Sequence, residues 1–273
     1  DKWEIPTLTE NQGEEILPDI ATAILEKLQE KGIQKEEVAG IGVGVPGPVN
    51  SEGDVLCAVN LFWGYKKVSK ELGEMTGIPV KAENDANVAA LGEAWRGAAA
   101  GAQNVVMVTL GTGVGGGIIV NEQILSGAHG ASGEIGHINV DHEETESCNC
   151  GNQGCLEQMA SATGVVRLAK KALDCSDAPS VLREGELTAK AVFDAYKAGD
   201  KLAEEVVEKF GDYLGGALAS VTCVTDPSVI VVGGVSKAGQ PLIDCVTKYY
   251  KKYAFSACKA TPIILAALGN DAG

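Results

Sequence analysis

A chain of 273 residues is long enough for one large domain or two ordinary ones. Its composition, 45% hydrophobic but only 5% aromatic, suits a core of Val, Ile, Leu and Ala, the usual filling of buried parallel strands. The formal net charge of −15 makes nucleic acid a poor partner for the surface. No apolar run approaches the roughly 20 residues that a membrane span requires, so we expect no membrane partner either.

The first third of the sequence alternates helical and strand patterns. Apolar residues recur at helical spacing over 16–32, where Gly32 is a natural C-terminal stop. Residues 38–49 (VAGIGVGVPGPV) predict an apolar strand that runs into a Pro/Gly turn, with glycines that permit close approach of another backbone or of a ligand. A loop and a short helix are predicted over 60–77. A short strand, a polar turn and a helix are predicted over 78–99.

That polar turn contains Glu83, Asn84, Asp85 and Asn87. Asp or Asn between a strand and a helix is first of all a capping residue, and capping explains one of these side chains. It does not easily explain four polar residues at the carboxyl end of a strand, where open α/β sheets bind their ligands. We therefore predict that Asp85 is a general base and that Asn84 is a ligand of a hydroxyl group.

A glycine-rich loop between two apolar strands is the clearest local pattern, over 104–120 (NVVMVTLGTGVGGGIIV). Its glycines expose successive backbone N–H groups, which suits a phosphate, and Thr112 adds a hydroxyl. The loop lacks the Gly-Lys-Ser/Thr ending of a Walker A motif. A strand rather than a helix follows it, unlike in a dinucleotide fingerprint. On its own, the pattern fits a structural hairpin as well as it fits a phosphate site.

A cluster of metal-ligand residues follows within 137–157 (HINVDHEETESCNCGNQGCLE). The thiolates of Cys148, Cys150 and Cys155 with the imidazole of His137 make a complete tetrahedral Zn²⁺ set, which is closed and therefore structural. Two glycines lie between the last two cysteines, where a chain that turns tightly around an ion needs them. The alternative is an ordinary loop with three reduced cysteines, whose spacing is then coincidence. We predict a structural zinc site.

Two carboxylates flank this cluster: Glu134 in GASGEIGH (130–137), and Glu157 just after the last cysteine. If zinc ties His137 to the cysteines, the two glutamates and His137 share one neighbourhood. Each carboxylate can accept hydrogen bonds from two hydroxyls, so this rim suits a polyhydroxylated ligand. For either glutamate alone, a solvated loop charge is the simpler interpretation.

The rest of the chain is mostly helical by pattern. Helices are predicted over 162–173, over 188–226 with a break near Gly199, and over 241–255. Residues 227–239 predict a strand that enters a glycine turn, an arrangement that lets a nucleotide lie against the backbone. Residues 262–271 predict a final strand. The five cysteines outside the metal cluster are scattered without a disulfide pattern, which predicts a reducing cytoplasm.

Six motifs together resemble the ROK family, in the family's own order. They are GVGVPGPV (42–49), ENDANVAALGE (83–93), TLGTGVGGGI (109–118), GASGEIGHINV (130–140), CNCGNQGCLE (148–157) and VVGGV (231–235). They span almost the whole chain, and the central motifs are together highly specific. The resemblance implies an actin-like (ribonuclease H-like) sugar-kinase fold of two α/β domains with the active site in a cleft between them. We expect a small domain over 1–84 and a large domain over 85–273, the latter with the zinc loop 137–157.

The resemblance also implies an activity and assigns residues to it. Asp85 would take the proton from the 6-hydroxyl of a hexose, with glucose the expected sugar, as that hydroxyl attacks the γ-phosphate of ATP. Mg²⁺ would accompany the ATP. The sugar's other hydroxyls would be held by Gly47, Asn84, Glu134, His137 and Glu157. The phosphates would meet Gly111, Thr112, Gly113 and Gly115, and the adenosine would meet Gly233 and Gly234. His137 would bind zinc with one ring nitrogen and the sugar with the other.

Other functions in the family remain alternatives. Some members phosphorylate fructose or N-acetylmannosamine, and others are sugar-responsive transcriptional regulators with a helix-turn-helix, which this sequence does not show. Homodimers and homotetramers are common in the family, so we expect one of the two. The family's N-terminal Asp-x-Gly-Gly-Thr phosphate loop does not occur here, and residues 3–7 (WEIPT) read as the end of a strand. We therefore expect the natural protein to be longer than this chain.

Overall fold

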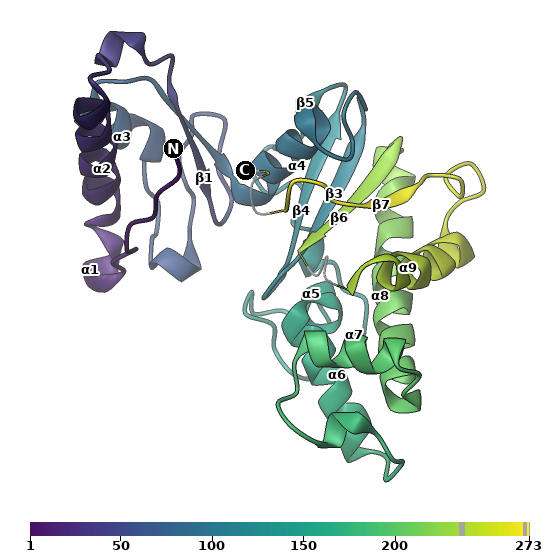
Figure 1. Ribbon diagram of the computed structural model, residues 1–273. Coiled ribbons are helices and arrows are strands. Elements are labelled where there is room, and N and C mark those ends of the chain that lie inside the picture. Colours follow the sequence, from purple (N-terminus) through teal and green to yellow (C-terminus); the bar gives the residue numbers. More distant parts are fainter. Residues whose placement is uncertain (235–237, 270–271, 273) are drawn as a thin grey trace. The chain divides into compact units, whose positions relative to one another are not determined.

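The computed structural model describes residues 1–234, 238–269 and 272 (Figure 1). The chain separates into two compact units. The first unit comprises Asp1–Val88 and Ser126–Ser132, and the second comprises Ala89–Leu125 and Gly133–Gly273. The division falls inside one helix, and a short segment of the chain returns to the first unit. The expected domain boundary between residues 84 and 85 stays a prediction.

The first unit contains a two-stranded parallel sheet and the helices that pack on it. Its elements are α1 (Glu10–Gly13), α2 (Ile16–Lys31), the 3₁₀ turns Lys35–Glu37 and Val59–Leu61, β1 (Ile41–Val45), α3 (Val68–Thr76), β2 (Val80–Asn84) and the start of α4 (Asp85–Arg96). The strands pair from Ile41 opposite Val80 to Val45 opposite Asn84. Because they are parallel, their carboxyl ends lie at one edge, where the loop after β1 meets the start of α4.

A buried tryptophan anchors the core of the first unit. Trp63 packs with apolar residues of α2, β1 and β2, and its Nε1 donates a hydrogen bond to the carbonyl of Gly13 at 3.0 Å. Gly13 has a φ of 66°, and a Cβ there would lie 2.8 Å from Trp63 Nε1, so glycine is required. Helix α2 ends at Gly32, whose φ of 67° is the left-handed C-cap that the sequence predicts.

The second unit contains a five-stranded mixed sheet in the order β5-β4-β3-β6-β7. Its elements after α4 are β3 (Val105–Leu110), β4 (Val114–Val120), β5 (Gln123–Ile124), the 3₁₀ turns Ile135–His137 and Val181–Arg183, α5 (Leu156–Ala160), α6 (Ala162–Asp174), α7 (Ala189–Lys197), α8 (Lys201–Thr225), β6 (Val229–Gly234), α9 (Gln240–Tyr253) and β7 (Ile263–Leu265). Strands β3, β6 and β7 are parallel to one another, whereas β4 and β5 are antiparallel to their neighbours.

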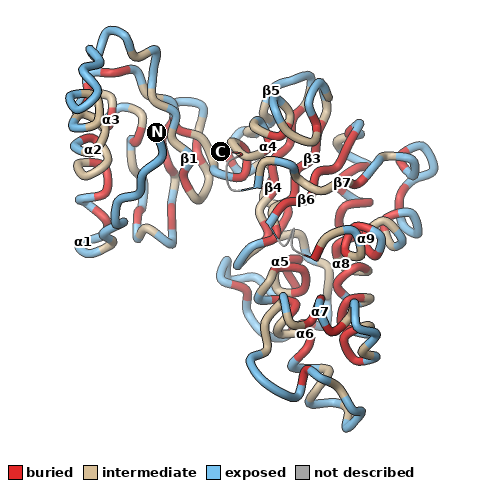
Figure 2. Tube along the Cα trace, viewed as in Figure 1, coloured by how far each residue is buried: buried red, intermediate tan, exposed pale blue. Residues whose placement is uncertain are grey.

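Helices cover both faces of this sheet, and buried residues concentrate along its central strands (Figure 2). Val105 and Met107 of β3 pack with Ala90 of α4 on one face. The alternate residues Val106 and Val108 face the larger core that α5 to α9 build on the other. A strand that is buried on both faces needs a continuous apolar sequence, which VVMVTL supplies. None of the helices in the described parts of the chain has the length and hydropathy that crossing a membrane requires.

Three local predictions were wrong in detail. The polar turn over 83–87 is no turn, because β2 ends at Asn84 and α4 begins at Asp85; Asn84 caps the helix itself, so no loop residue is needed. Residues 3–7 form no strand: among the described residues, the sheet of the first unit pairs only β1 with β2. The final strand covers only Ile263–Leu265, and residues 270 and 271 of the predicted strand lie outside the described residues.

The predicted break between the helices of 188–226 is confirmed. Helix α7 ends at Lys197 and α8 begins at Lys201, with Gly199 between them at a φ of 84°. Asp200 then caps α8 by accepting a hydrogen bond from the amide of Ala203 at 3.0 Å. Of the predicted glycine turn after β6, residues 235–237 lie outside the described residues.

A buried carboxylate joins distant segments of the second unit. Glu93 of α4 is fully buried and accepts hydrogen bonds from the backbone amides of Ala98 (2.7 Å), Ala267 (3.1 Å) and Leu268 (2.8 Å). Ala98 follows α4, whereas the other two residues follow β7. A carboxylate that accepts several backbone hydrogen bonds holds such segments more strongly than a neutral acceptor does.

We predict that Glu93→Gln lowers the free energy of unfolding by about 2 kcal/mol, because the charge-assisted hydrogen bonds are lost and an amide donor faces backbone donors. Urea denaturation of the variant and of the wild type measures the difference. Glu205→Gln, at an exposed position of α8, is the matched control and should leave stability unchanged. Equal stability of the Glu93 variant and the wild type would contradict the role given to this carboxylate.

Candidate functional site

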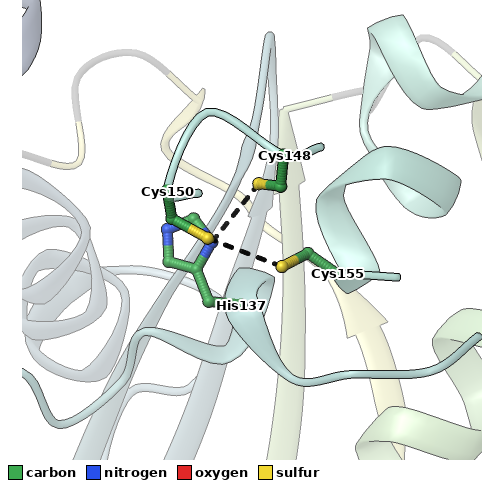
Figure 3. A group of neighbouring side chains, drawn as sticks. All are labelled: His137, Cys148, Cys150 and Cys155. Atoms are coloured by element: carbon green, nitrogen blue, oxygen red, sulfur yellow. Dashed lines mark hydrogen bonds between the residues drawn. The ribbon is translucent and has the colours of Figure 1, made fainter. Parts of the chain in front are cut away.

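His137, Cys148, Cys150 and Cys155 converge on one point in the second unit (Figure 3). Their ligand atoms all lie within 4.8 Å of one another. His137 ends a 3₁₀ turn, Cys155 immediately precedes α5, and the other two cysteines come from the loop between them. The structure therefore brings together the four residues that the sequence predicts as metal ligands.

The spacing of these atoms fits a tetrahedral ion. Thiolates about 2.3 Å from a Zn²⁺ ion lie about 3.8 Å from one another. Cys150 Sγ lies 3.6 Å from Cys155 Sγ, and Cys148 Sγ lies 3.8 Å from His137 Nδ1. Three sulfurs and one imidazole nitrogen form a complete, closed set that could hold a zinc ion as a structural metal.

A carboxylate lies against the Cys/His cluster that these four residues form. Glu157 of α5 accepts a hydrogen bond from Cys148 Sγ at 3.0 Å. Burial, together with this neighbouring carboxylate, raises the pKa of the Cys148 thiol in the metal-free chain. A bound cation favours the thiolate instead and displaces its proton. A bound ion would therefore free Oε1 of Glu157 from the thiol and leave this oxygen available to another donor.

The two ring nitrogens of His137 face different partners. Nδ1 faces Cys148 Sγ, whereas Nε2 lies 3.9 Å from a carboxylate oxygen of Glu134. An imidazole can bind a metal through one nitrogen and form a hydrogen bond through the other. Glu134, His137 and Glu157 thus lie around one cluster, which is the neighbourhood that the zinc hypothesis predicts.

The glycine-rich loop connects β3 to β4 and touches Glu157. Oε2 of that carboxylate would lie 2.4 Å from a Cβ at Gly113, so a side chain there would require the carboxylate to move. The amide of Gly111 donates to the carbonyl of Gly113 at 3.0 Å, which closes the hairpin. Of the predicted phosphate contacts, Gly111, Thr112 and Gly113 form the loop itself, whereas Gly115 lies within β4.

Gly233 and Gly234 end β6 at the same edge of the sheet. Because β6 is parallel to β3, Gly234 lies opposite Leu110, the residue before the glycine-rich loop. Gly234 has a φ of 85°, and a Cβ there would lie 2.1 Å from the Leu110 carbonyl oxygen, so glycine is required. The glycines predicted for the phosphates and for the adenosine therefore share one sheet edge. Val235, which ends the VVGGV motif, lies outside the described residues.

The predicted catalytic residues of the first unit lie where β2 passes into α4. Asn84 accepts hydrogen bonds from the amides of Ala86 (2.9 Å) and Asn87 (3.1 Å), so it is the cap of α4. Its Nδ2 also donates to the carbonyl of Gly47 at 3.0 Å. The structure thus places Gly47, Asn84 and Asp85 together, and it shows that the capping and ligand interpretations of Asn84 are compatible, because one amide proton remains.

Asp85 is the first residue of α4. Its Oδ1 accepts a hydrogen bond from the amide of Ala86 at 2.8 Å, and the side chain reaches solvent. Protein atoms nevertheless crowd the carboxylate, and this desolvation raises its pKa above the ordinary 3.8, although the backbone hydrogen bonds oppose the shift. A carboxylate that binds a proton more readily than usual is a better general base.

A hydroxyl side chain at the start of α6 also reaches the glycine-rich loop, and a second hydroxyl contacts the first. Thr163 Oγ1 donates to the carbonyl of Thr112 at 2.7 Å, and Ser161 lies 2.9 Å from Thr163 Oγ1. Neither residue is a candidate in the sequence. A serine ahead of a helix signals an N-cap, but no local pattern reports a contact between residues 51 positions apart.

Residues 3–273 match the ROK family. The chain belongs to the ROK family. This chain is 44% identical over 280 residues to a glucokinase of Halalkalibacterium halodurans, an alignment that covers 100% of this chain and 85% of the relative. It is 33% identical over 275 residues to a glucokinase of Thermotoga maritima, with coverage of 98% and 85%.

Solved structures of ROK proteins resemble this one over nearly its whole length. A ROK family glucokinase from Streptomyces griseus, in complex with glucose and AMPPNP, has a TM-score of 0.80 at 32% identity, covering 99% of this chain and 88% of that one. A ROK family transcriptional regulator, a homolog of the E. coli MLC protein, has a TM-score of 0.84 at 28% identity, with coverage of 95% and 66%. The predicted actin-like sugar-kinase fold of a ROK protein is confirmed.

We predict that the purified protein contains about one zinc ion per chain and that Cys150→Ser loses it, because a closed site needs all four ligands. Elemental analysis after dialysis measures the content. Cys175→Ser, at an exposed cysteine outside the cluster, should retain the metal. Unchanged zinc in the Cys150 variant would refute the assignment of these four ligands.

Proposed function

We propose that this protein is an ATP-dependent hexose kinase that converts glucose to glucose 6-phosphate. The observation that carries the proposal is the placement of Asp85, a carboxylate with a raised pKa at the start of α4, beside Asn84 and Gly47. The full-length similarity to the glucokinase of H. halodurans supports glucose as the sugar. The complex of the S. griseus glucokinase with glucose and AMPPNP supports ATP as the phosphoryl donor.

In the proposed reaction, the 6-hydroxyl oxygen of glucose forms a bond to the γ-phosphorus of ATP. Asp85 accepts the hydroxyl proton, the bond between the γ-phosphorus and its bridging oxygen breaks, and ADP leaves. A loose transition state of this kind needs the reacting groups to be aligned more than it needs a strong base. The capped start of α4 gives Asp85 a fixed position, which serves that alignment.

The remaining sugar hydroxyls would bind to the side chains that the sequence predicts for them. Asn84 donates one of its two side-chain amide protons to the carbonyl of Gly47, and it would donate the other to a sugar hydroxyl. In the second unit, Glu134, His137 Nε2 and the Glu157 carboxylate would bind further hydroxyls. Each carboxylate can accept from two hydroxyl groups, which favours a ligand with adjacent hydroxyls over an apolar one. Zinc would act there only as the structural tie between His137 and the cysteines.

The nucleotide would lie along the edge of the sheet where β3 and β6 end. Gly111, Thr112, Gly113 and Gly115 would approach the phosphates, and Gly233 and Gly234 would approach the adenosine. Mg²⁺ bound with ATP would neutralise the developing charge on the phosphates. Family resemblance further supports a homodimer or homotetramer, and the scattered free cysteines support a cytoplasmic location.

A sugar-responsive regulator is the second candidate, since the MLC homolog is structurally similar. Such a protein would bind sugar through the same hydroxyl-binding residues and would not turn ATP over. The acidic balance of this chain does not favour contact with DNA. Other hexoses also remain candidates, because the sequence motifs do not distinguish a pocket for a 2-hydroxyl from one for a 2-acetamido group.

The test is a panel of glucose, mannose, fructose, N-acetylmannosamine and N-acetylglucosamine in which both binding and ADP production are measured. We predict that glucose binds selectively and gives the highest kcat/KM. Preference for an amino sugar would change the substrate and keep the mechanism. Sugar binding without ADP production would favour the regulator, and the absence of any binding by folded, zinc-loaded protein would refute the proposal.

We predict that Asp85→Asn lowers kcat by about 10²- to 10⁴-fold, as expected for loss of a general base, while glucose affinity changes little. In the wild type, kcat should fall with decreasing pH through a pKa above 3.8, because protonation of the raised-pKa carboxylate removes the base. The variant should lack that limb. Asp19→Asn, which removes an acidic residue from the first turn of α2, is the control. Loss of folding in the Asp85 variant would mean that the residue is structural.

A further inference from the structure

All three peptide carbonyls of the glycine-rich loop have hydrogen-bond partners within the second unit. The carbonyl of Gly111 accepts from the backbone amide of Ala162 at 2.8 Å, and that of Gly113 accepts from the amide of Gly111 at 3.0 Å. The carbonyl of Thr112 accepts from the side chain of Thr163 at 2.7 Å. Two of these three donors belong to the first turn of α6.

Two of the three loop amides are in the opposite situation. Within the described part of the chain, the backbone N–H groups of Thr112 and Gly113 have no protein acceptor, and both residues reach solvent. Because the loop carbonyls are engaged and these two amides are free, the backbone of the loop offers a ligand donors only. Such a surface favours an anion.

The orientation of these amides follows from the planarity of the peptide bond. In a trans peptide the carbonyl and the N–H of one unit point in opposite directions. The Thr112 carbonyl and the Gly113 amide belong to one unit, so a hydrogen bond that holds the carbonyl toward α6 aims the amide away from α6. The Ala162 amide has the same effect on the unit that joins Gly111 to Thr112.

The hydroxyl of Thr163, which binds the Thr112 carbonyl, is itself oriented by the hydroxyl of Ser161. Thr163 has a single hydroxyl proton, which it donates to Thr112, so in the 2.9 Å contact Ser161 is the donor. Ser161 in turn accepts from the amide of Gly164 at 2.9 Å as the N-cap of α6, and it is only 1% exposed. The buried serine therefore fixes the threonine, and the threonine fixes the loop.

We propose that Thr163, oriented by Ser161, is a positioning residue for phosphate binding: through the Thr112 carbonyl it aims the Gly113 amide at the phosphates of ATP. The proposal rests on the proposed kinase function, since ATP is the ligand that it names. Thr163 acts only through the loop. Its loss should therefore affect the nucleotide and leave the sugar unaffected.

The first test compares three variants in steady-state kinetics. Thr163→Val keeps the shape but removes the hydroxyl and should raise the KM for ATP about fivefold, while the KM for glucose stays within about twofold. Thr163→Ser restores the hydroxyl and should restore the KM. Thr188 is the N-cap of α7: its hydroxyl accepts a hydrogen bond from the amide of Ala191 and does not reach the loop. Thr188→Val is therefore the control and should change neither KM.

The second test does not depend on catalysis. In ¹⁵N relaxation of the nucleotide-free protein, Thr163→Val should lower the order parameters of the Thr112 and Gly113 amides, and Thr188→Val should not. Unchanged loop order, equal rises in both KM values, or failure of Thr163→Ser to restore the KM would each overturn the proposal. A wild type without kinase activity would instead refute the kinase function, and the relaxation result would still decide whether Thr163 orders the loop.

Discussion

The contact of Glu157 with both the Cys/His cluster and the glycine-rich loop is the constraint on which the site of the second unit depends. One carboxylate oxygen meets Cys148, and the other lies against Gly113. The helix that carries Glu157 begins directly after Cys155, another metal ligand. A structural ion in the cluster would therefore set the start of α5, the direction of this carboxylate and the space beside the loop at the same time.

Asp85 is held by different means. Its position depends on the pairing of β2 with β1, on the cap that Asn84 provides, and on the first turn of α4. None of these uses a metal. Asp85 and the groups of Glu134, His137 and Glu157 proposed for sugar binding are thus held by different devices, one made of backbone hydrogen bonds and the other centred on the Cys/His cluster.

Sequence reasoning succeeded where the signal is local. The four residues predicted as metal ligands lie within one short segment and converge in the structure, and glycines with left-handed φ values, such as Gly32 and Gly199, end helices as predicted. It failed where the partner is distant: Glu93 binds the amide of Leu268 and Thr163 binds Thr112 across separations that no periodicity encodes. The hydrogen bond between Asn84 and Gly47 could not be predicted either, because it depends on the parallel register of β1 and β2.

The direct passage of β2 into α4 also limits how the chain can be altered. Residues of a helix follow one another at about 100° around its axis, since 3.6 of them complete a turn. An inserted residue between Asn84 and Asp85 would separate the cap from the carboxylate and turn the acid onto another side of the helix. A length change at this junction would therefore cost the protein the cap, the direction of the acid, or both.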